Sequence, residues 1–304
     1  MSADQAAAVE VDVALVKQLL ADQYPQWEAL TVTPVDSGGT DNAIFRLGDS
    51  MSVRMPKVEW SVGQVDKEQR WLPYLAPRLT LPIPEPVAMG FPGRGYPWRW
   101  SIYGWLEGDV AKADEVGSSV ALAQDLALFV RELHAVDATG GPEPGPHNFD
   151  RGLPLAGLDQ ETSEAIADLE AIGGLADVDR IREVWASSLA LPKWEHAPVW
   201  VHGDLQAGNI LLRDGRLAAV LDFGGLGVGD PACDLLVGWN LFSGAARQAY
   251  FDGVGADDAT WARGRAWAFA VAVIQLPYYH TRRPRIAANA THVIGQVLES
   301  IDSE

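Results

Sequence analysis

The stretch from Val201 to Leu235 reads VHGDLQAGNILLRDGRLAAVLDFGGLGVGDPACDL, and it constrains the fold more than any other part of the chain. Its two β-prone runs, 210–212 and 218–221, flank Asp214-Gly215, a dipeptide typical of the tight turn of a β-hairpin. A hairpin returns the chain on itself, so a side chain just before its first strand and one just after its second could face one point. We therefore expect the polar residues at the two ends of this hairpin to act together.

Three polar elements in this stretch stand at a fixed spacing. Asn209 follows the aspartate of His202-Gly203-Asp204 by five residues, and Asp222-Phe223-Gly224 begins thirteen residues after the asparagine. This spacing reproduces the kinase set H-x-D-x-x-x-x-N followed by D-F-G. Phosphoryl transfer needs in-line positioning and cancellation of developing charge, and Mg²⁺, which prefers hard oxygen ligands, does most of the cancelling. The spacing predicts Asn209 and Asp222 as metal ligands, and Asp204 as the group that accepts or orients the proton of the acceptor hydroxyl.

The segments HGDLQAGNIL, DFG and GDPACDL resemble the aminoglycoside phosphotransferase family, whose members are small-molecule kinases with a protein-kinase-like fold. Upstream, SGGTDNAIFRL resembles the family's phosphate-covering hairpin, SVRMPK its third strand, and DKEQRWLPYLAPRLTLPIPEPV its paired helix and following strand. The resemblance covers about residues 10–300. It implies an α+β, two-lobed fold with an N-terminal antiparallel sheet plus a helix and a larger, mainly helical C-terminal lobe. We expect residues 1–106 to form the nucleotide-binding lobe with its hinge, and residues 107–304 the catalytic and acceptor-binding lobe.

The resemblance also implies a cation on the third strand that holds the nucleotide, and a carboxylate on the helix that pairs with it. The family's lysine falls on Arg54, whose guanidinium likewise presents a fixed positive charge to phosphate oxygens. The alternative for Arg54 is an exposed charge at a strand edge. Lys57 is a weaker candidate because it lies beyond the expected end of the strand. Glu68 is the candidate partner, with Asp66 and Glu59 as alternatives after a small shift of alignment.

Two backbone segments complete the implied nucleotide site. The turn between the first two expected strands departs from G-x-G-x-x-G, but its backbone and polar side chains are candidates for phosphate contact. These candidates are Ser37, Gly38, Gly39, Thr40 and Asn42. The connector between the lobes, which in kinases reads the purine with backbone groups, includes Tyr103 and Trp105. We expect these two residues to act through their main chain more than through their side chains.

Five residues near the motif are predicted to be structural. Asp230 and Asp234 in GDPACD are expected to fix the catalytic loop through hydrogen bonds to its backbone, and His202 is expected to brace that loop. Cys233, the single cysteine, is predicted to be buried and inert. His134 in the segment ELHAVD is predicted to be a packed or capping residue.

Apolar periodicity and turn residues predict the remaining elements. Helices are expected over 13–20, 64–75, 120–136, 161–172 and 178–190, and short strands over 30–35, 43–47, 51–55, 98–105 and 200–202. Residues 139–158, rich in glycine and proline, are predicted to be loop, and residues 231–302 to be helix and loop.

The formal net charge of −18 excludes two classes of partner. A nucleic-acid binder would need a basic stripe, and an anionic membrane would repel this chain, so we expect neither. The charge is uneven, −3 over residues 1–106 and −15 over residues 107–304. It indicates either a solvated acidic surface or a cleft that attracts a cationic ligand. The candidate acids of such a cleft are Asp159, Glu161, Glu164, Asp168, Asp257 and Asp258.

These observations predict a Mg²⁺-dependent enzyme that moves the γ-phosphoryl group of ATP or GTP to a hydroxyl of a small, cationic molecule such as an aminoglycoside. Such chemistry is associated with antibiotic resistance. A macrolide, a sugar or an amino alcohol is the alternative acceptor, although the family's macrolide branch commonly carries histidine at the position of Asn209. A non-catalytic pseudokinase is a further alternative, suggested by the altered glycine turn and by Arg54.

The remaining features concern regulation and location. The short segment GGLGVGDP that follows Phe223 disfavours a regulated protein kinase, which would carry a long activation loop. One cysteine, and no signal peptide or membrane span visible in the sequence, predict a cytoplasmic protein. No obligate protein partner is evident from the sequence.

Overall fold

The computed structural model describes residues 9–36 and 41–302, and its chain packs into two compact units. Of the described residues, 9–36, 41–110 and 208–224 belong to the first unit, and 111–207 and 225–302 belong to the second. The hairpin of the motif therefore packs with the N-terminal part of the chain, although it lies far along the sequence. The division of nucleotide and acceptor binding between residues 1–106 and 107–304 stays a prediction.

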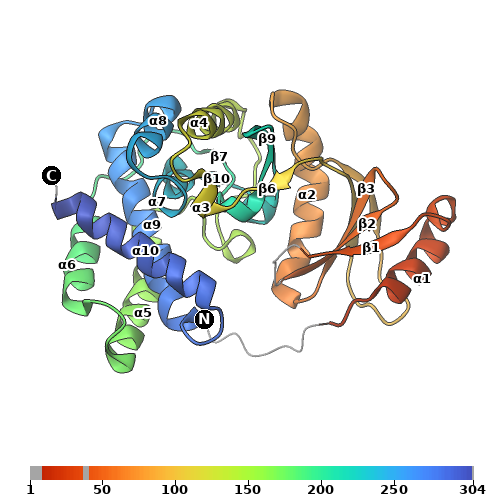
Figure 1. Ribbon diagram of the computed structural model, residues 1–304, viewed down its shortest axis with the longest axis horizontal. Coiled ribbons are helices and arrows are strands. Elements are labelled where there is room, and N and C mark those ends of the chain that lie inside the picture. The colour runs from red at the N-terminus through yellow and green to blue at the C-terminus, as the bar shows by residue number, and fades with distance from the viewer. Residues whose placement is uncertain (1–8, 37–40, 303–304) are drawn as a thin grey trace. The chain divides into compact units, whose positions relative to one another are not determined.

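A five-stranded antiparallel sheet forms the framework of the first unit (Figure 1). Its strands follow the order β1-β2-β3-β5-β4. They are β1 (Val32–Val35), β2 (Asn42–Leu47), β3 (Met51–Pro56), β4 (Pro86–Gly90) and β5 (Trp100–Gly104). All neighbouring pairs are antiparallel, which confirms the sheet expected for this part of the chain.

The two faces of this sheet differ because successive residues of a strand point to opposite sides. On one face, α1 (Val13–Gln23) packs its apolar side chains against a buried cluster that includes Val53 and Met55 of β3. Arg54 lies between these two residues and therefore points to the opposite face. There it meets α2 (Val62–Leu75), the predicted helix. Alternation along one strand thus places a cation beside a helix.

A small second sheet of the first unit carries the hairpin of the motif. It consists of β6 (Asp109–Val110), β8 (Ile210–Arg213) and β9 (Arg216–Val220), in the order β6-β8-β9. Asp214 and Gly215 turn the chain between β8 and β9, and both adopt a positive φ, 52° and 73°, as a tight two-residue turn requires. The predicted hairpin is confirmed, whereas β6, two residues long, is too short to have a sequence pattern.

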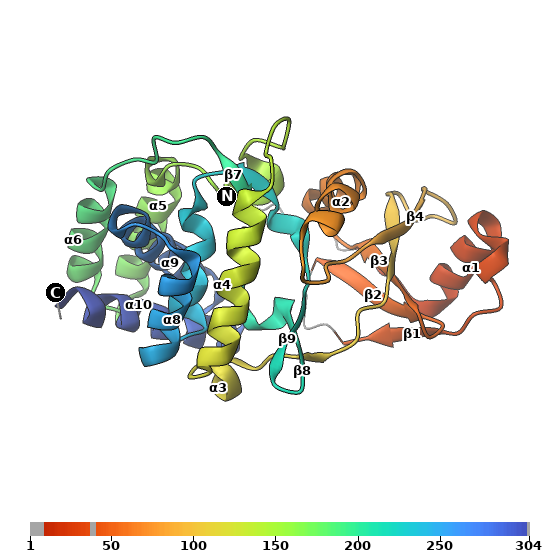
Figure 2. The same cartoon turned by 90° about the horizontal axis from the view of Figure 1, so that it is seen from above.

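The second unit is mainly helical, as predicted (Figure 2). Its long helices are α4 (Val120–Ala135), α5 (Asp159–Ile172), α6 (Val178–Leu189), α8 (Gly244–Val254), α9 (Asp258–Tyr279) and α10 (Pro284–Asp302). Its shorter elements are α3 (Ala113–Val116), α7 (Val237–Asn240) and an antiparallel pair of strands, β7 (Val199–Val201) and β10 (Gly227–Gly229). The sequence does not predict β10, because two residues of Gly-Val-Gly are glycines, which disfavour strands.

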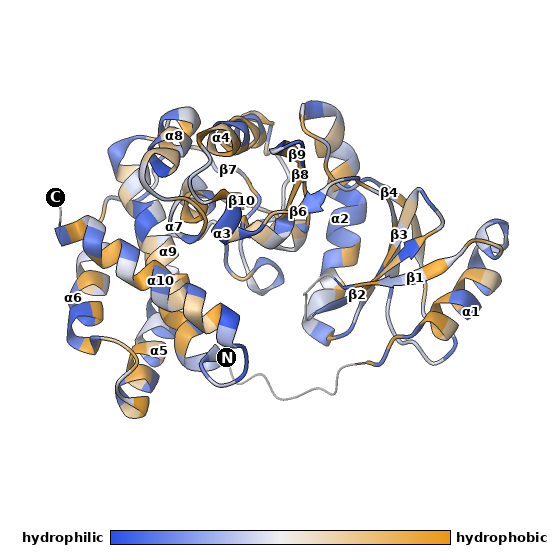
Figure 3. Ribbon diagram, in the orientation of Figure 1, coloured by the Kyte–Doolittle hydropathy of each residue, from blue (hydrophilic) through white to orange (hydrophobic). Residues whose placement is uncertain are grey.

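Helix α9 lies in the core of the second unit, where it packs against α5, α6 and α10. Its buried residues, among them Trp267, Phe269 and Val273, lie on several sides of the helix, which is typical of a core helix. Helix α10 covers it with one apolar face, visible in Figure 3 as alternating orange and blue bands. Within residues 9–36 and 41–302, no helix is both long enough and apolar enough to cross a membrane.

Candidate active site

The open end of the β8–β9 hairpin carries the two predicted metal ligands. Ile210 pairs with Val220 in the ladder, and the backbone N–H of Leu221 donates to the carbonyl oxygen of Asn209 at 2.8 Å. Asn209 and Asp222 therefore lie at the same end of the hairpin. Asn209 is buried, whereas the side chain of Asp222 is 43% exposed. Solvent, and hence a ligand, can reach the Asp222 carboxylate.

The backbone of Asp222 is held in an uncommon conformation. Its φ is 56°, in the left-handed region that few non-glycine residues adopt. The Oδ1 atom of Asp222 accepts hydrogen bonds from the backbone N–H of Gly224 at 3.2 Å and from Arg54 Nη2 at 2.8 Å. A Cβ atom at Gly224 would lie 2.8 Å from Gln64 Nε2, so a larger residue there would require the Gln64 side chain to move.

Arg54 connects the hairpin to helix α2. Its Nη1 donates to Glu68 Oε1 at 2.5 Å, its Nη2 donates to Gln64 Oε1 at 3.1 Å, and its side chain is only 14% exposed. Burial by itself would lower the pKa of Arg54, but the carboxylates of Asp222 and Glu68 raise it well above its ordinary value. The guanidinium is therefore a permanent cation inside the unit, and an exposed charge at a strand edge does not describe it.

Glu68, rather than Asp66 or Glu59, is the helix partner of Arg54. Glu68 is almost fully buried, and its Oε2 accepts a hydrogen bond from the Tyr103 hydroxyl. Burial and the Glu68 carboxylate raise the pKa of Tyr103 well above its ordinary value, so the hydroxyl remains a donor. Asp66 instead pairs with a surface arginine, and Glu59 is exposed.

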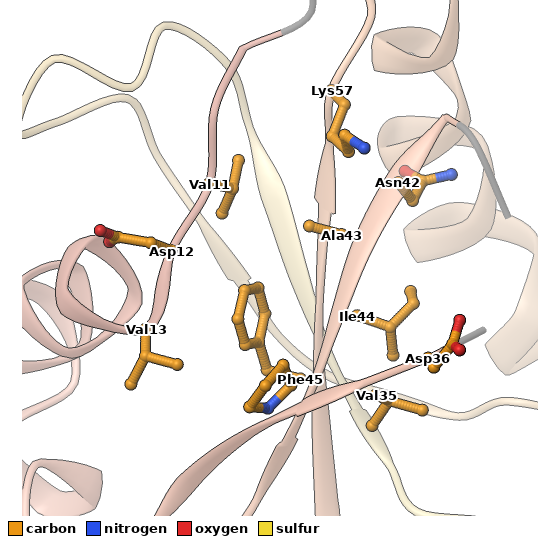
Figure 4. Close-up of a pocket in the computed structure, with 11 residues that line it drawn as sticks. Val11, Asp12, Val13, Val35, Asp36, Asn42, Ala43, Ile44, Phe45 and Lys57 are labelled. Carbon is orange, nitrogen blue, oxygen red and sulfur yellow. The ribbon is translucent and has the colours of Figure 1, made fainter. Parts of the chain in front are cut away.

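Two further predicted nucleotide residues lie on or beside the sheet. The amide of Asn42, oriented with its oxygen toward the guanidinium, accepts from Arg54 Nη2 at 3.0 Å. Lys57 lines a cavity of about 400 Å³ together with Asp12, which caps the N-terminus of α1, and Phe45 of β2 (Figure 4). Glu68 pairs with Arg54, whereas Lys57 lies beyond the end of β3. The predicted residues Ser37, Gly38, Gly39 and Thr40 lie outside the described residues.

The predicted hinge residues differ in how they are used. Tyr103 reaches the Arg54–Glu68 pair with its side chain, although we expected its main chain to matter more. The backbone N–H of Trp105 donates to the carbonyl oxygen of Ser50 at 2.8 Å, and Arg46 stacks on the Trp105 ring at 4.4 Å. The Trp105 donor is thus engaged within the first unit, and a role for either residue toward a purine stays a prediction.

Lys67 is a charged member of this cluster that the sequence patterns did not reveal. It is 8% exposed, and its Nζ donates to the carbonyl oxygen of Gly224 at 2.6 Å. Burial lowers the pKa of Lys67 to about 8. The only signal in the sequence is the spacing of Gln64, Lys67 and Glu68, which lie at i, i+3 and i+4 and hence on one side of the helix.

In the second unit, one fully buried carboxylate holds the loop that carries Asp204. Asp234 Oδ1 accepts from the backbone N–H of Gly203 at 2.7 Å, and Asp234 Oδ2 accepts from that of His202 at 3.0 Å. His134 Nε2 lies 3.1 Å from the same Oδ2. The predicted bracing role of Asp234 is confirmed, and His134 is a packed residue that contacts this carboxylate.

Hydrogen bonds and close packing hold the loop around Asp204. The backbone N–H of Asp204 donates to Nδ1 of the buried His202 at 3.2 Å, which confirms the bracing role of that histidine. Gly203 has a φ of 76°, and a Cβ atom there would lie 2.6 Å from the carbonyl oxygen of Gly225. Gln206 Nε2 donates to Asp204 Oδ2 at 3.1 Å, and Asp204 is partly exposed. Its carboxylate is therefore presented to solvent from a fixed backbone.

Asp230 has a different role from the predicted one. Its carboxylate forms a buried ion pair with Arg263 of α9, with contacts of 2.7 and 3.3 Å, and it accepts from the backbone N–H of Ala232. It thus holds the short helical turn Pro231–Leu236 to the core helix instead of bonding to the catalytic loop. Cys233 in the same turn is fully buried, and burial raises its pKa, as expected of an inert thiol.

Known proteins resemble this chain in sequence and in fold. An aminoglycoside 3′-phosphotransferase from Escherichia coli is 25% identical over 218 residues, which cover 67% of this chain and 69% of that protein. The GDP and kanamycin complex of APH(2″)-IIIa superposes with a TM-score of 0.74 at 20% identity, over 94% of this chain and 98% of that one. A macrolide 2′-phosphotransferase from Brachybacterium faecium has a TM-score of 0.61 at 24% identity, over 93% and 97% of the two chains. These likenesses confirm the predicted fold.

A family model identifies the chain more directly. The model of the phosphotransferase enzyme family matches residues 31–267. The matched range contains β3 and α2, the loop of Asp204 and the whole β8–β9 hairpin, so it covers the elements that carry the kinase spacing. Because this match spans well over half of the sequence and the fold agrees with it, the chain belongs to the phosphotransferase enzyme family.

Proposed function

We propose that the protein transfers the γ-phosphoryl group of ATP or GTP to a hydroxyl of a small, cationic molecule of the aminoglycoside class. One observation carries the proposal: Arg54 joins Glu68 of α2 to Asp222 of the motif through hydrogen bonds of 2.5 and 2.8 Å. Phosphoryl transfer depends on fixed positive charge near the phosphates and on a carboxylate poised for metal binding. A chance occurrence of the kinase spacing would not also assemble this network.

Asp204 is the proposed catalytic residue. Its carboxylate accepts the proton of the acceptor hydroxyl or orients that hydroxyl for attack. Asp234 and His202 fix its backbone, so little reorganisation is needed when an acceptor arrives. Its partial exposure suits a group that must meet a substrate.

Asn209 and Asp222 are the proposed ligands of Mg²⁺, and their chemistry fits that ion. An amide oxygen and a carboxylate are hard oxygen donors, and the backbone bond from Leu221 to Asn209 keeps the two residues at one end of the hairpin. Bound Mg²⁺ would neutralise charge on the phosphate oxygens. The part of this chain is to present the two side chains, and Arg54 and the 222–224 turn fix the orientation of Asp222.

The nucleotide is proposed to lie against the first unit. Arg54 is the proposed cation near the phosphates, with Glu68 holding it in place, and Asn42 is a proposed neighbour of the same guanidinium. Ser37, Gly38, Gly39 and Thr40 are proposed to contact the phosphates, and the main chain around Tyr103 and Trp105 to contact the purine. Solved relatives support such a ligand, since APH(2″)-IIIa was obtained with GDP and APH(2″)-IIa with ATP and streptomycin.

The aminoglycoside class is proposed as acceptor on two grounds. Relatives were solved with kanamycin and with gentamicin, and the net charge of −15 over residues 107–304 favours a polycation. A macrolide is the second candidate because two macrolide 2′-phosphotransferases share the fold, with TM-scores of 0.61 and 0.60.

A transfer assay tests the proposal. The full chain, Mg²⁺ and γ-radiolabelled ATP or GTP are incubated with separate pools of aminoglycosides, macrolides and hydroxylated metabolites. We expect label to appear on at least one aminoglycoside with the native protein and on none with Asp204→Asn. Label on the macrolide or metabolite pool alone would show that the acceptor belongs to that class and not to the aminoglycosides. No transfer to any pool by a protein that binds nucleotide would contradict the proposal and favour a non-catalytic binding protein.

A further inference from the structure

Helix α2 is linked to the 222–224 turn of the motif in three ways. Arg54, which is held by Gln64 and Glu68 of α2, donates to the carboxylate of Asp222. The backbone of Gly224 approaches the Gln64 side chain, since a Cβ atom built on Gly224 would lie 2.8 Å from Gln64 Nε2. The third contact is direct and polar: Lys67 Nζ donates to the carbonyl oxygen of Gly224 at 2.6 Å. All of these residues belong to the first unit, so the contacts lie within one compact body.

The position of Lys67 is unusual for its residue type. Lysine is almost never fully buried unless it is paired, because taking an ammonium group out of water is costly. Lys67 is nevertheless 8% exposed, on a helix whose other inward residues include the apolar Val65 and Leu72. A residue needed only to fill this space would be apolar. The hydrogen bond to Gly224 is the feature that a hydrocarbon side chain could not supply.

The backbone conformation of the turn that Lys67 contacts requires stabilising contacts. Asp222 has a positive φ of 56°, a conformation that costs free energy for a residue with a side chain. Such a backbone persists where surrounding contacts fix it, and Gly224 lies two residues further on. Arg54 fixes the carboxylate of Asp222. The carbonyl of Gly224 is fixed by Lys67.

We propose that Lys67 is a positioning residue that clamps the 222–224 turn to α2 and so presents the Asp222 carboxylate in the orientation that binds the divalent metal ion. Two cations then act on the same turn, since Arg54 holds the side chain of Asp222 and Lys67 holds the backbone behind it. In this proposal Lys67 acts on the metal site through the turn. The inference rests on the proposed function in one respect, the assignment of Asp222 as a metal ligand.

Hydrogen exchange of the ligand-free protein tests the clamp without using activity. Lys67→Met keeps the length and volume of the side chain but removes the donor, and Lys17→Met, at an exposed position of α1, is the matched control. We expect faster exchange in Lys67→Met for peptides that span residues 219–226, and native exchange for β2 and β3. Lys17→Met should exchange like the native protein throughout. Native exchange of the turn in Lys67→Met would overturn the proposal.

Metal binding tests the functional half of the inference. Mn²⁺ affinity is measured by electron paramagnetic resonance with a non-hydrolysable nucleotide present, which requires no acceptor. We expect Lys67→Met to weaken Mn²⁺ binding about tenfold, the effect of one charge-assisted hydrogen bond, and Lys67→Arg, which keeps a cationic donor, to remain within about threefold of native. Equal weakening in both variants, or none in Lys67→Met, would overturn the proposal.

The two measurements separate this inference from the proposed function. A native protein that binds no Mn²⁺ contradicts the proposed metal site, while faster exchange of the turn in Lys67→Met would still support the clamp itself. If Lys67→Met does not fold, Lys67→Gln serves in its place, because its shorter amide stays polar but leaves the Gly224 carbonyl without its donor. Circular dichroism confirms that each variant is folded before either measurement.

Discussion

The Arg54 guanidinium lies 2.8 Å from the Asp222 carboxylate, and this ion pair joins strand β3 to the end of a hairpin that begins more than 150 residues later. The same guanidinium holds Glu68 of α2, so one side chain links three elements of the first unit. An arginine can make these bonds at once because its planar group presents several donors, which an ammonium group cannot arrange in the same way.

Two replacements of Arg54 distinguish the effect of its charge from the effect of its several simultaneous hydrogen bonds. Arg54→Met leaves the buried Glu68 without its cation, and breaking a buried pair in this way costs about 3–5 kcal/mol, so we expect both lower stability and a loss of activity greater than a hundredfold. Arg54→Lys keeps the charge but loses the simultaneous contacts, and we expect kcat/KM to fall about tenfold. Urea unfolding and steady-state kinetics measure these effects. Native stability of Arg54→Met would show that the Arg54 network does not stabilise the fold.

Asp204→Asn is expected to lower kcat at least a hundredfold, because the amide cannot accept the proton of the acceptor hydroxyl. Nucleotide affinity, measured by calorimetry, should stay close to native. Gln206→Ala, which removes only a partner of the Asp204 carboxylate, should lower kcat no more than threefold. An Asp204→Asn variant with native turnover would refute the assignment of Asp204.

Two glycines of the same loop give a matched pair. A methyl group at Gly203 would meet the Gly225 carbonyl oxygen at 2.6 Å in a backbone with positive φ, whereas a methyl group at Gly208 has no neighbour within 4 Å. We therefore expect Gly203→Ala to lower the free energy of unfolding by about 2 kcal/mol or more and to reduce kcat, with Gly208→Ala close to native. Thermal unfolding and kinetics of the two variants decide this; equal behaviour would mean that the loop is not fixed as described.

The stability of the fold should depend on pH through Lys67. Burial lowers its pKa in the folded protein from 10.5 to about 8, so between these values the unfolded chain binds more protons at this group than the folded chain does. The free energy of unfolding of the native protein, minus that of Lys67→Met, should therefore rise as pH increases from 8 to 10.5. The full rise is on the order of 3 kcal/mol. Denaturant unfolding at a series of pH values measures the difference, and a flat or falling profile would contradict it.

Local patterns are sufficient to predict much of the site. The Asp214-Gly215 turn and its flanking strands predict a hairpin, and the structure places Asn209 and Asp222 at its open end. The pairing of Arg54 with Glu68 follows from the family resemblance, which implies a cation on the third strand and a carboxylate on the helix, and the structure contains this pair. These predictions depend on the regular geometry of a hairpin or on motifs shared with a known family.

Contacts between distant residues are beyond that reasoning. Lys67 and Gly224 are separated by 157 positions, and nothing next to either residue indicates the other. The nearness of Asp230 to Asp234 in the sequence suggests a bond to the catalytic loop, but its partner is Arg263, on a helix that packs there only in the folded chain. The contact of the Tyr103 side chain with Glu68 escapes prediction for the same reason. Tertiary packing chooses such partners.

The burial of Cys233 has a practical consequence. Cys233 is the single cysteine of the chain, and it is fully buried. Because burial also raises its pKa, the native protein should not react with thiol-reactive probes. A cysteine introduced on the surface of either unit would then be the only group to accept a dye or a spin label. The wild-type sequence is thus a ready background for distance measurements by fluorescence or resonance, with no native residue to remove first.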